Sequence, residues 1–287
     1  MKPSVASPKF GPLTQGTIFN SAVAEDYADC ETHGIVLTAR CDVEQDKART
    51  YNYVPVVLLR DWRHRDGRIL LGERLMSDTI GKLRDALIAG GYSTSILETE
   101  HPRSVLQTLF PAANTTKMAK ARAEFDALCS RHELATQALS SDPAAGVCDA
   151  LAAAAPKLRT RLVQELTSHR LAGYYFLQQI DPQGDDIGYV ALLREVQLIP
   201  RKLAQAIGTG LDADTFARMC GEDPTLKERL RIGPKDLAMP VGILQSPNAE
   251  HFMQSFSLLF GRIGIADIDK SYIEKLWERQ SDTEGGI

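Results

Sequence analysis

The feature that most constrains the fold of this chain is a hydrophobic pattern that changes period twice. Continuous apolar runs extend from Thr17 to Leu59, helical spacing begins at Ile69, and strand-like runs return at Gly173. Two short groups of strands cannot easily bury their apolar faces alone, because isolated hairpins are marginally stable. We therefore expect both groups to join one small antiparallel sheet or barrel, with a helical block between them.

The expected strands are rich in Val, Ile, Tyr and Thr, which favours an extended backbone. They run from Thr17 to Phe19, Gly34 to Ala39, Tyr51 to Leu59, Gly173 to Leu177 and Gly188 to Pro200. The residues before Gly16 contain several prolines and are expected to be irregular. In the helical block, Gly90-Gly91 ends one helix and Pro156 must break or kink another. Near the C-terminus, Ser246 and Pro247 suit the start of a further helix.

Composition narrows the class of protein. Apolar residues make up 44% and charged residues 24% of the 287 residues, which is typical of a folded domain and not of a disordered chain. The formal net charge of -4 gives no general attraction for phosphate, so a nucleic-acid role would need a local basic patch. The N-terminus lacks an apolar signal segment, and no stretch approaches about 18 uninterrupted apolar residues. We expect a cytoplasmic protein that does not enter a membrane.

The number and spacing of the cysteines fit a protein of the reducing cytoplasm. The five cysteines are widely spaced and form no C-x-x-C pair, which predicts reduced thiols instead of a disulfide framework. Cys30-x-x-His33 could be a zinc-ligand pair, extended by Cys41 and Asp42, with a loop cysteine and an exposed histidine as the alternative. No second close pair completes such a site. We predict no metal and no other cofactor.

The densest cluster of polar residues follows the second expected strand. Its candidate catalytic residues are Arg40, Cys41, Asp42 and Lys47. A cation beside Cys41 would favour the thiolate, but His33 lies at the other end of the strand, roughly 20 Å away. That distance is too long for a nucleophile and its base. The interpretation that we favour is a small buried cysteine, followed by an aspartate that starts a turn.

A local basic patch supplies the candidate nucleic-acid-binding residues. They are Arg60, Trp62, Arg63, Arg65 and Arg68. The arginines would contact phosphate and Trp62 would stack on a base, although interleaved acidic residues dilute the charge. The alternative is a solvated connection between a strand and a helix. No signature of P-loop, dinucleotide-binding, zincin or esterase chemistry occurs in the sequence.

Three short motifs occur in the order Gly16-Thr17-Ile18-Phe19, Gly34-Ile35-Val36-Leu37-Thr38 and Tyr53-Val54-Pro55-Val56-Val57. Together they resemble the SH3-like barrels of the MazF/PemK toxins, over about the first 60 residues. Those toxins cleave RNA with an arginine just before the second strand and a hydroxyl residue just after the Val-Pro-Val element. Here His33-Gly34 and Val57 take those places. The resemblance therefore implies the barrel and puts the cleavage chemistry in doubt.

Three other motifs lie further apart in the chain. They are Arg40-Cys41-Asp42, the segment from Tyr189 to Arg194, and Phe260-Gly261-Arg262-Ile263-Gly264. In these the whole chain looks closer to a set of uncharacterised bacterial proteins, whose style suggests accessory genes of defence systems or mobile elements.

With these resemblances, the predicted fold class is α+β: a small antiparallel SH3-like β-barrel that is split by a large helical insertion and followed by C-terminal helices. The predicted parts are residues 13–67 and 172–200 for the barrel, 68–171 for the insertion, 201–279 for the C-terminal helical region and 280–287 for a disordered tail.

The leading functional hypothesis is a non-enzymatic protein-binding or adaptor subunit of a bacterial multi-protein system, such as an anti-phage defence system. It would engage another protein of the same locus through the barrel surface near Arg40, Asp42 and Lys47, or through the helical block. The alternative is an RNA- or DNA-binding or endoribonuclease module derived from a MazF-like barrel. A third hypothesis is a metal- or thiol-dependent enzyme at Cys41. The missing arginine and hydroxyl pair ranks the adaptor first.

Overall fold

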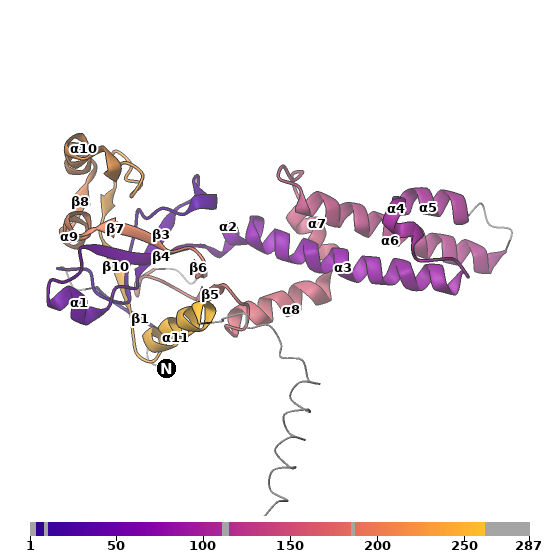
Figure 1. Cartoon of the computed structure of the whole chain (residues 1–287), viewed down its shortest axis with the longest axis horizontal. Helices are drawn as coiled ribbons and strands as arrows, with labels where there is room; N and C mark the ends of the chain where they lie inside the picture. The colour runs from indigo at the N-terminus through magenta and orange to yellow at the C-terminus, as the bar shows by residue number, and fades with distance from the viewer. Residues whose placement is uncertain (1–3, 9–10, 111–114, 185–186, 262–287) are drawn as a thin grey trace, which may run out of the picture.

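The structure is a computed structural model that describes residues 4–8, 11–110, 115–184 and 187–261. It combines a curled antiparallel sheet, here called the half-barrel, with a long helical arm that projects from it (Figure 1). The predicted mixture of one antiparallel sheet and helices is confirmed. The SH3-like character of the barrel stays a prediction.

Within the described residues, eight strands form the half-barrel. Seven are ordered β1-β10-β2-β3-β4-β6-β5, and β7 also pairs with β4. The strands are β1 (Val5–Ala6), β2 (Thr17–Phe19), β3 (Thr32–Val36), β4 (Thr50–Leu58), β5 (Tyr174–Leu177), β6 (Tyr189–Leu192), β7 (Gln197–Pro200) and β10 (Pro240–Leu244). Because β4 and β5 belong to the same sheet, the chain leaves this sheet after β4, forms helices α2 to α8, and returns to it at β5.

The expected strand from Gly188 to Pro200 is divided into two. Its first part, β6, pairs with the C-terminal half of β4, and its second part, β7, pairs with the N-terminal half. Between the two pairings, residues 192–196 face only Val54 and Pro55 of β4. Pro55 cannot donate a hydrogen bond, so an irregular segment opposite it loses little pairing.

The sheet is curled, so that its two ends come close to each other. The chain just after β5 passes so close to β10 that a Cβ atom on Gly242 would lie 2.1 Å from the carbonyl oxygen of Ile180. Ile180, Val5 and Leu244 are buried in one apolar cluster at this contact. Only glycine at position 242 allows this approach.

The arm consists of α2 (Leu59–His64), α3 (Asp66–Ala89), α4 (Ile96–Thr99), α5 (Pro102–Leu109), α6 (Thr116–Leu139), α7 (Val147–Ala154) and α8 (Pro156–Thr167). Its two 24-residue helices, α3 and α6, pack side by side (Figure 1). The expected stops at Gly90 and before Pro156 are confirmed. Among the described residues, no helix combines the length and the apolar character that crossing a bilayer requires.

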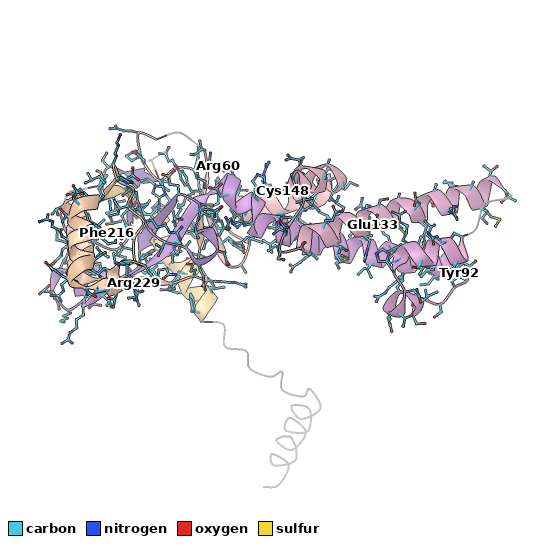
Figure 2. The ribbon with its side chains drawn as sticks, turned by 90° about the horizontal axis from the view of Figure 1, so that it is seen from above. Arg60, Tyr92, Glu133, Cys148, Phe216 and Arg229 are labelled. Carbon is cyan, nitrogen blue, oxygen red and sulfur yellow. The ribbon has the colours of Figure 1, made fainter. Side chains whose placement is uncertain are left out.

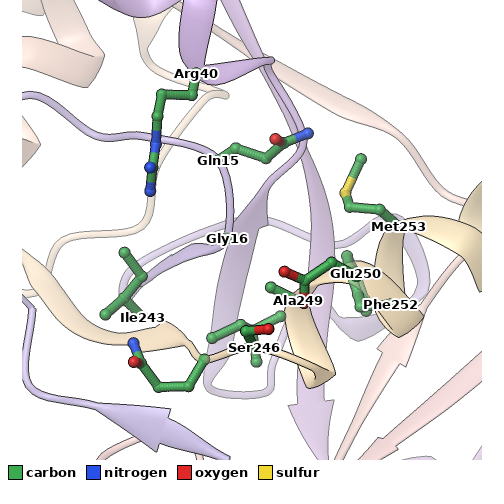
Figure 3. A pocket seen from close by; sticks show the side chains of 11 residues that line it. Gln15, Gly16, Arg40, Ile243, Ser246, Ala249, Glu250, Phe252 and Met253 are labelled. Atoms are coloured by element: carbon green, nitrogen blue, oxygen red, sulfur yellow. The ribbon is translucent and has the colours of Figure 1, made fainter.

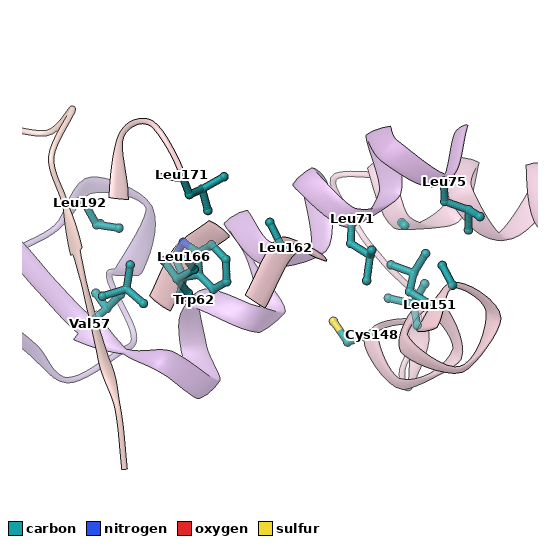
Figure 4. Packing of buried hydrophobic residues seen from close by; sticks show 14 of the residues in the cluster. Val57, Trp62, Leu71, Leu75, Cys148, Leu151, Leu162, Leu166, Leu171 and Leu192 are labelled. Carbon is teal, nitrogen blue, oxygen red and sulfur yellow. The ribbon is translucent and has the colours of Figure 1, made fainter. Parts of the chain in front are cut away.

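One apolar cluster joins the arm to the sheet (Figure 4). It runs from Val57 and Leu192 on the sheet, through Trp62 of α2, to Leu71 and Leu75 on α3. A separate cluster fills the distal end of the arm and contains Leu83, Leu87, Val105, Leu106, Phe125 and Cys129. The arm therefore has its own core, separate from the cluster around Trp62 that connects it to the sheet, which we call the joint.

The segment after β7 differs from the expected helical region. Besides α9 (Arg201–Thr209), α10 (Ala213–Glu222) and α11 (Asn248–Phe260), it contains the small β8 (Leu211–Asp212) and β9 (Leu237–Ala238) pair and the strand β10. β10 lies between β1 and β2 inside the sheet. Its five residues contain a proline and a glycine, so no strand signal stands out. The helix expected after Gly264 and the tail from residue 280 lie outside the described residues.

The N-terminal segment differs in the same way. Val5–Ala6, which the prolines around it led us to expect as irregular, pairs with β10 as the edge strand β1. Two residues are too few for a recognisable strand pattern.

Candidate functional site: the surface around helix α1

The candidate site is built around a short helix, α1 (Arg40–Glu44), that follows β3. The expected strand from Gly34 to Ala39 is wrong at this end, because β3 stops at Val36. Leu37 still donates to the carbonyl of Asn52 at 2.8 Å, and the Thr38 hydroxyl accepts from the Asn52 amide at 2.8 Å. The chain then turns away from β4 into α1.

The carbonyl group of Asp42 closes the loop on the far side of α1. It accepts hydrogen bonds from the amides of Lys47 at 2.9 Å and Ala48 at 3.2 Å, which returns the chain to β4. The expectation that Asp42 starts a turn with its side chain is thus replaced by a turn closed through its backbone oxygen. The arginine of α9 that follows β7 secures the same loop, since Arg201 binds Asp46 through its side chain at 2.7 Å.

Three hollows border α1 in the described part of the chain. The first, of about 710 Å³, lies between Arg40, Ile243 of β10, and Glu250 and Met253 of α11 (Figure 3). A second, of about 850 Å³, lies between Arg40 and the N-terminal segment. The third, of about 590 Å³, lies on the other side of α1, against α11. Helix α1 is therefore a ridge between concave surfaces.

The third hollow combines apolar and charged side chains. Val196, Met253 and Phe256 contribute apolar surface, and Asp42 and Lys47 contribute charge. Apolar exposure continues along α11, because the ring of Phe260 contacts that of Phe256 at 4.8 Å and is itself 56% exposed. We call Arg40, Asp42, Lys47, Val196, Met253 and Phe256 the α1–α11 surface.

The candidate catalytic residues are brought to this surface but not to one centre. Arg40 lines the first and second hollows, whereas Asp42 and Lys47 line the third. Cys41 is exposed, so its interpretation as a small buried residue is wrong. Its Sγ lies 3.8 Å from Oδ1 of Asp42, which offers a negative charge and no cation.

His33 is buried, contrary to the alternative of an exposed histidine. Burial lowers the pKa of His33 to about 4, and its ring packs edge-on against Tyr189 at 5.9 Å. Among the described residues, no three His, Cys, Asp or Glu side chains are placed to hold a metal ion together. Cys30 and His33 therefore lack further ligands within that part of the chain.

The basic patch is divided between surface and interior. Arg60 and Arg63 are exposed (Figure 2 labels Arg60, near the joint), and Arg63 lies 3.5 Å from Asp149. Trp62 is only 4% exposed and packs edge-on against Tyr174, so it is not available to stack on a base. Arg68 is also buried, where it donates to backbone carbonyls at the end of α6.

Arg65, the remaining residue of the patch, is committed to the half-barrel. Its guanidinium lies 5.1 Å above the ring of Tyr27 and binds the Asp29 carboxylate and the Asp26 carbonyl. Aromatic stacking and ion pairing of this kind hold an arginine in one orientation. Arg65 thus contributes to the joint between half-barrel and arm.

A cluster at that joint was missed by the sequence analysis. Asp66, the first residue of α3, accepts a hydrogen bond from the Tyr27 hydroxyl at 3.2 Å and also bonds with Tyr174 of β5. Burial raises the pKa of Asp66 above its usual range, and burial together with Asp66 raises the pKa of Tyr27 well above 10. The three residues come from separate elements, so no local pattern could reveal them.

Comparisons with protein-family models, with curated proteins and with solved structures find no match for this chain. The resemblance to MazF/PemK toxins therefore stays a prediction. Functional inference for this protein depends on the site itself.

Proposed function

We propose that this protein is a non-enzymatic adaptor that binds another protein of the same bacterial system at the α1–α11 surface. The observation that supports the proposal is a concave shape lined by apolar side chains, of which Val196 is exposed and Met253 and Phe256 are partly buried. Concave apolar surface bordered by charged side chains is typical of sites that accept a partner.

The charged residues of this surface have a different role in the proposal. Asp42 and Lys47 line the third hollow beside the apolar side chains, and Arg40 lines the first hollow, so both signs of charge border this surface. Mixed charge at a rim selects a complementary partner and does not attract polyanions in general. This favours a protein over a nucleic acid, in line with the net charge of -4.

The nucleic-acid alternative has lost part of its basis. Of its five candidate residues, Trp62 and Arg68 are buried and Arg65 is bound to Asp29. Single-strand binding needs exposed aromatic rings beside the cations.

The test is co-purification of the tagged full-length chain with the products of its neighbouring genes. The critical variant is Met253→Asp with Phe256→Asp, which places charge on the apolar part of the α1–α11 surface. The matched control is Ile88→Asp with Val163→Asp, which changes two exposed apolar residues of the arm. A central apolar contact contributes about 2 kcal/mol or more, so binding should weaken roughly 30-fold or more in the first variant only.

Three outcomes would contradict the proposal. The first is that no gene product of the locus binds in stable proportion. The second is that the control loses the partner and the α1–α11 variant keeps it. The third is RNA or DNA cleavage by the purified protein that is lost on Arg40→Ala or Lys47→Ala.

A further inference from the structure

Two histidines and a tyrosine form a cluster where α11 meets the half-barrel. The ring of His169, which follows α8, stacks on the ring of Tyr175 of β5, with centroids 4.1 Å apart and planes at 20°. The Tyr175 hydroxyl bonds with Nδ1 of His251 on α11 at 3.0 Å. The two imidazole rings are 5.1 Å apart. The cluster therefore connects α8, the sheet and α11, which lie next to one another in Figure 1.

His169 occupies a backbone position that seldom carries such a side chain. Its φ of 56° is left-handed, and the amide of Arg170 bonds back to the carbonyl of Glu165 at 2.8 Å to close the end of α8. Glycine or asparagine is the usual residue there, because other side chains crowd the backbone. An unfavourable backbone at a residue that makes specific ring contacts suggests a role for its side chain.

The interior of the cluster provides little compensation for charge on His169. Its Nδ1 is buried and has no hydrogen-bond partner in the described part of the structure. Burial lowers the pKa of His169, and the charge of His251 lowers it further. Burial raises the pKa of Tyr175 to about 12, so its hydroxyl stays protonated and cannot supply a negative charge.

The charged groups on the surrounding elements do not offset the histidines. On α11, Glu250 precedes His251 but lines the first hollow together with Arg40. At the end of α8, Arg170 is a further cation, whose guanidinium donates to Ser168 at 2.9 Å. Glu165 of α8 is engaged by Arg74 and Arg161. From β5, Tyr175 contributes only its neutral hydroxyl.

We propose that His169 and His251 form an acid-sensitive latch, which holds α11 on the half-barrel while at least one ring is neutral and loosens it when both are protonated. A single imidazolium is tolerated, because the ring of His251 is exposed and stays hydrated. A second positive charge 5.1 Å away meets direct repulsion, which salt screens little at such a distance.

The direction of the pH effect follows from proton binding. With its pKa lowered by docking, His169 binds fewer protons when α11 is docked than when α11 is free. Docking is therefore complete above the ordinary histidine pKa of about 6.5 and weakens as the pH falls below it. Since α11 supplies Met253 and Phe256, the latch would also make the α1–α11 surface acid-sensitive.

Hydrogen exchange of the full-length chain tests the latch without requiring a partner. Amides of residues 248–260 are followed at pH 7.5, 6.5 and 5.5, with rates corrected for intrinsic exchange. We expect protection of α11 to fall by about threefold to tenfold on acidification, while protection of α3 stays constant. This readout is independent of the proposed function, so either can fail alone.

Two variants remove the charge while preserving the local structure. His169→Asn accepts the left-handed backbone, and His251→Gln can still bond with the Tyr175 hydroxyl. Each should reduce the pH dependence of α11 protection, whereas the control His64→Gln, at an exposed position on α2, should leave it unchanged. Protection that is constant down to pH 5.5 in the unaltered protein would overturn the proposal. So would a pH dependence that persists in both latch variants.

Discussion

The half-barrel and the arm are stabilised by contacts of different range. In the half-barrel, β10 from near the C-terminus pairs with β1 and β2 from near the N-terminus. In the arm, neighbouring helices pack on each other and are tied by ion pairs such as Arg103 with Glu133 and Arg131 with Asp78. The comparison teaches that one part of this protein is assembled from both ends of the chain, whereas the other is built from a single continuous stretch of it.

The two parts also present different surfaces. Strand ends and loops of the half-barrel leave hollows around α1, while the arm consists of helices that pack side by side (Figure 1). The joint between them depends on Trp62 and on the cluster of Asp66 with Tyr27 and Tyr174. Changes in each region, and at the joint, therefore test whether the two parts are stable independently.

The largest expected effect comes from the distal core of the arm. Phe125→Ala removes a fully buried ring that stacks on Phe110, and should cost about 4 kcal/mol. Because this cluster is separate from the sheet, hydrogen exchange should rise in α5 and α6 and stay constant in β3 and β4. Equal loss of protection in the half-barrel would show that the arm is not an independent part.

A single added methyl group should strongly destabilise the half-barrel. Gly242→Ala places a Cβ atom against the Ile180 carbonyl, which is backbone and cannot move away easily. We expect a loss of about 3 kcal/mol in urea unfolding. Exchange should rise first in β1, β2 and β10, since these strands meet at this contact. A neutral effect would contradict the close approach of the two sheet ends.

The joint can be tested at Asp66. Asp66→Leu leaves the hydroxyls of Tyr27 and Tyr174 without their buried acceptor and should cost about 2 kcal/mol. Asp66→Asn keeps an acceptor oxygen and should cost less. Urea unfolding followed by circular dichroism reports the loss. Equal stability of the Leu and Asn variants would show that the hydrogen bonds do not hold the arm.

Asp66 also makes the folding stability depend on pH in a definite direction. Burial raises the folded-state pKa of Asp66, so the folded protein favours the protonated carboxyl. The stability linked to this group is complete below the unfolded pKa of about 3.9 and is lost as the pH rises through the folded value. Relative to the unaltered protein, Asp66→Asn should therefore gain stability as the pH rises from about 4 to 7. The opposite trend would contradict the burial of this carboxyl.

The smallest expected effect is a gain in the arm. Gly81 lies inside α3, and a Cβ atom there would meet nothing within 4 Å. Gly81→Ala should stabilise the protein by about 0.5 to 1 kcal/mol, because alanine loses less backbone entropy in a helix. Thermal unfolding should detect the gain. A loss of stability in Gly81→Ala would mean that another group packs against α3 at this position.

Predictability from sequence follows the same division. The end of α3 and the start of α8 could be predicted, because Gly90 and Pro156 affect the backbone only of the adjacent helical turn. The strand β10 could not, since it is short and its partners β1 and β2 lie near the other end of the chain. The end of β3 could not, because the apolar run continues to Leu37 although the strand stops at Val36. For the candidate site, the sequence singled out Arg40, Asp42 and Lys47, which line neighbouring hollows, but not Met253, Phe256 and Val196.

The sequence by itself indicated one antiparallel sheet combined with helices, and a polar cluster after the second expected strand. These depend on hydrophobic period and on residues that act locally. The tertiary structure alone decided that Trp62 is buried, that Cys41 is exposed, and that His169 meets His251 across Tyr175. Burial and side-chain neighbours are set by contacts between distant segments, and no local pattern encodes them.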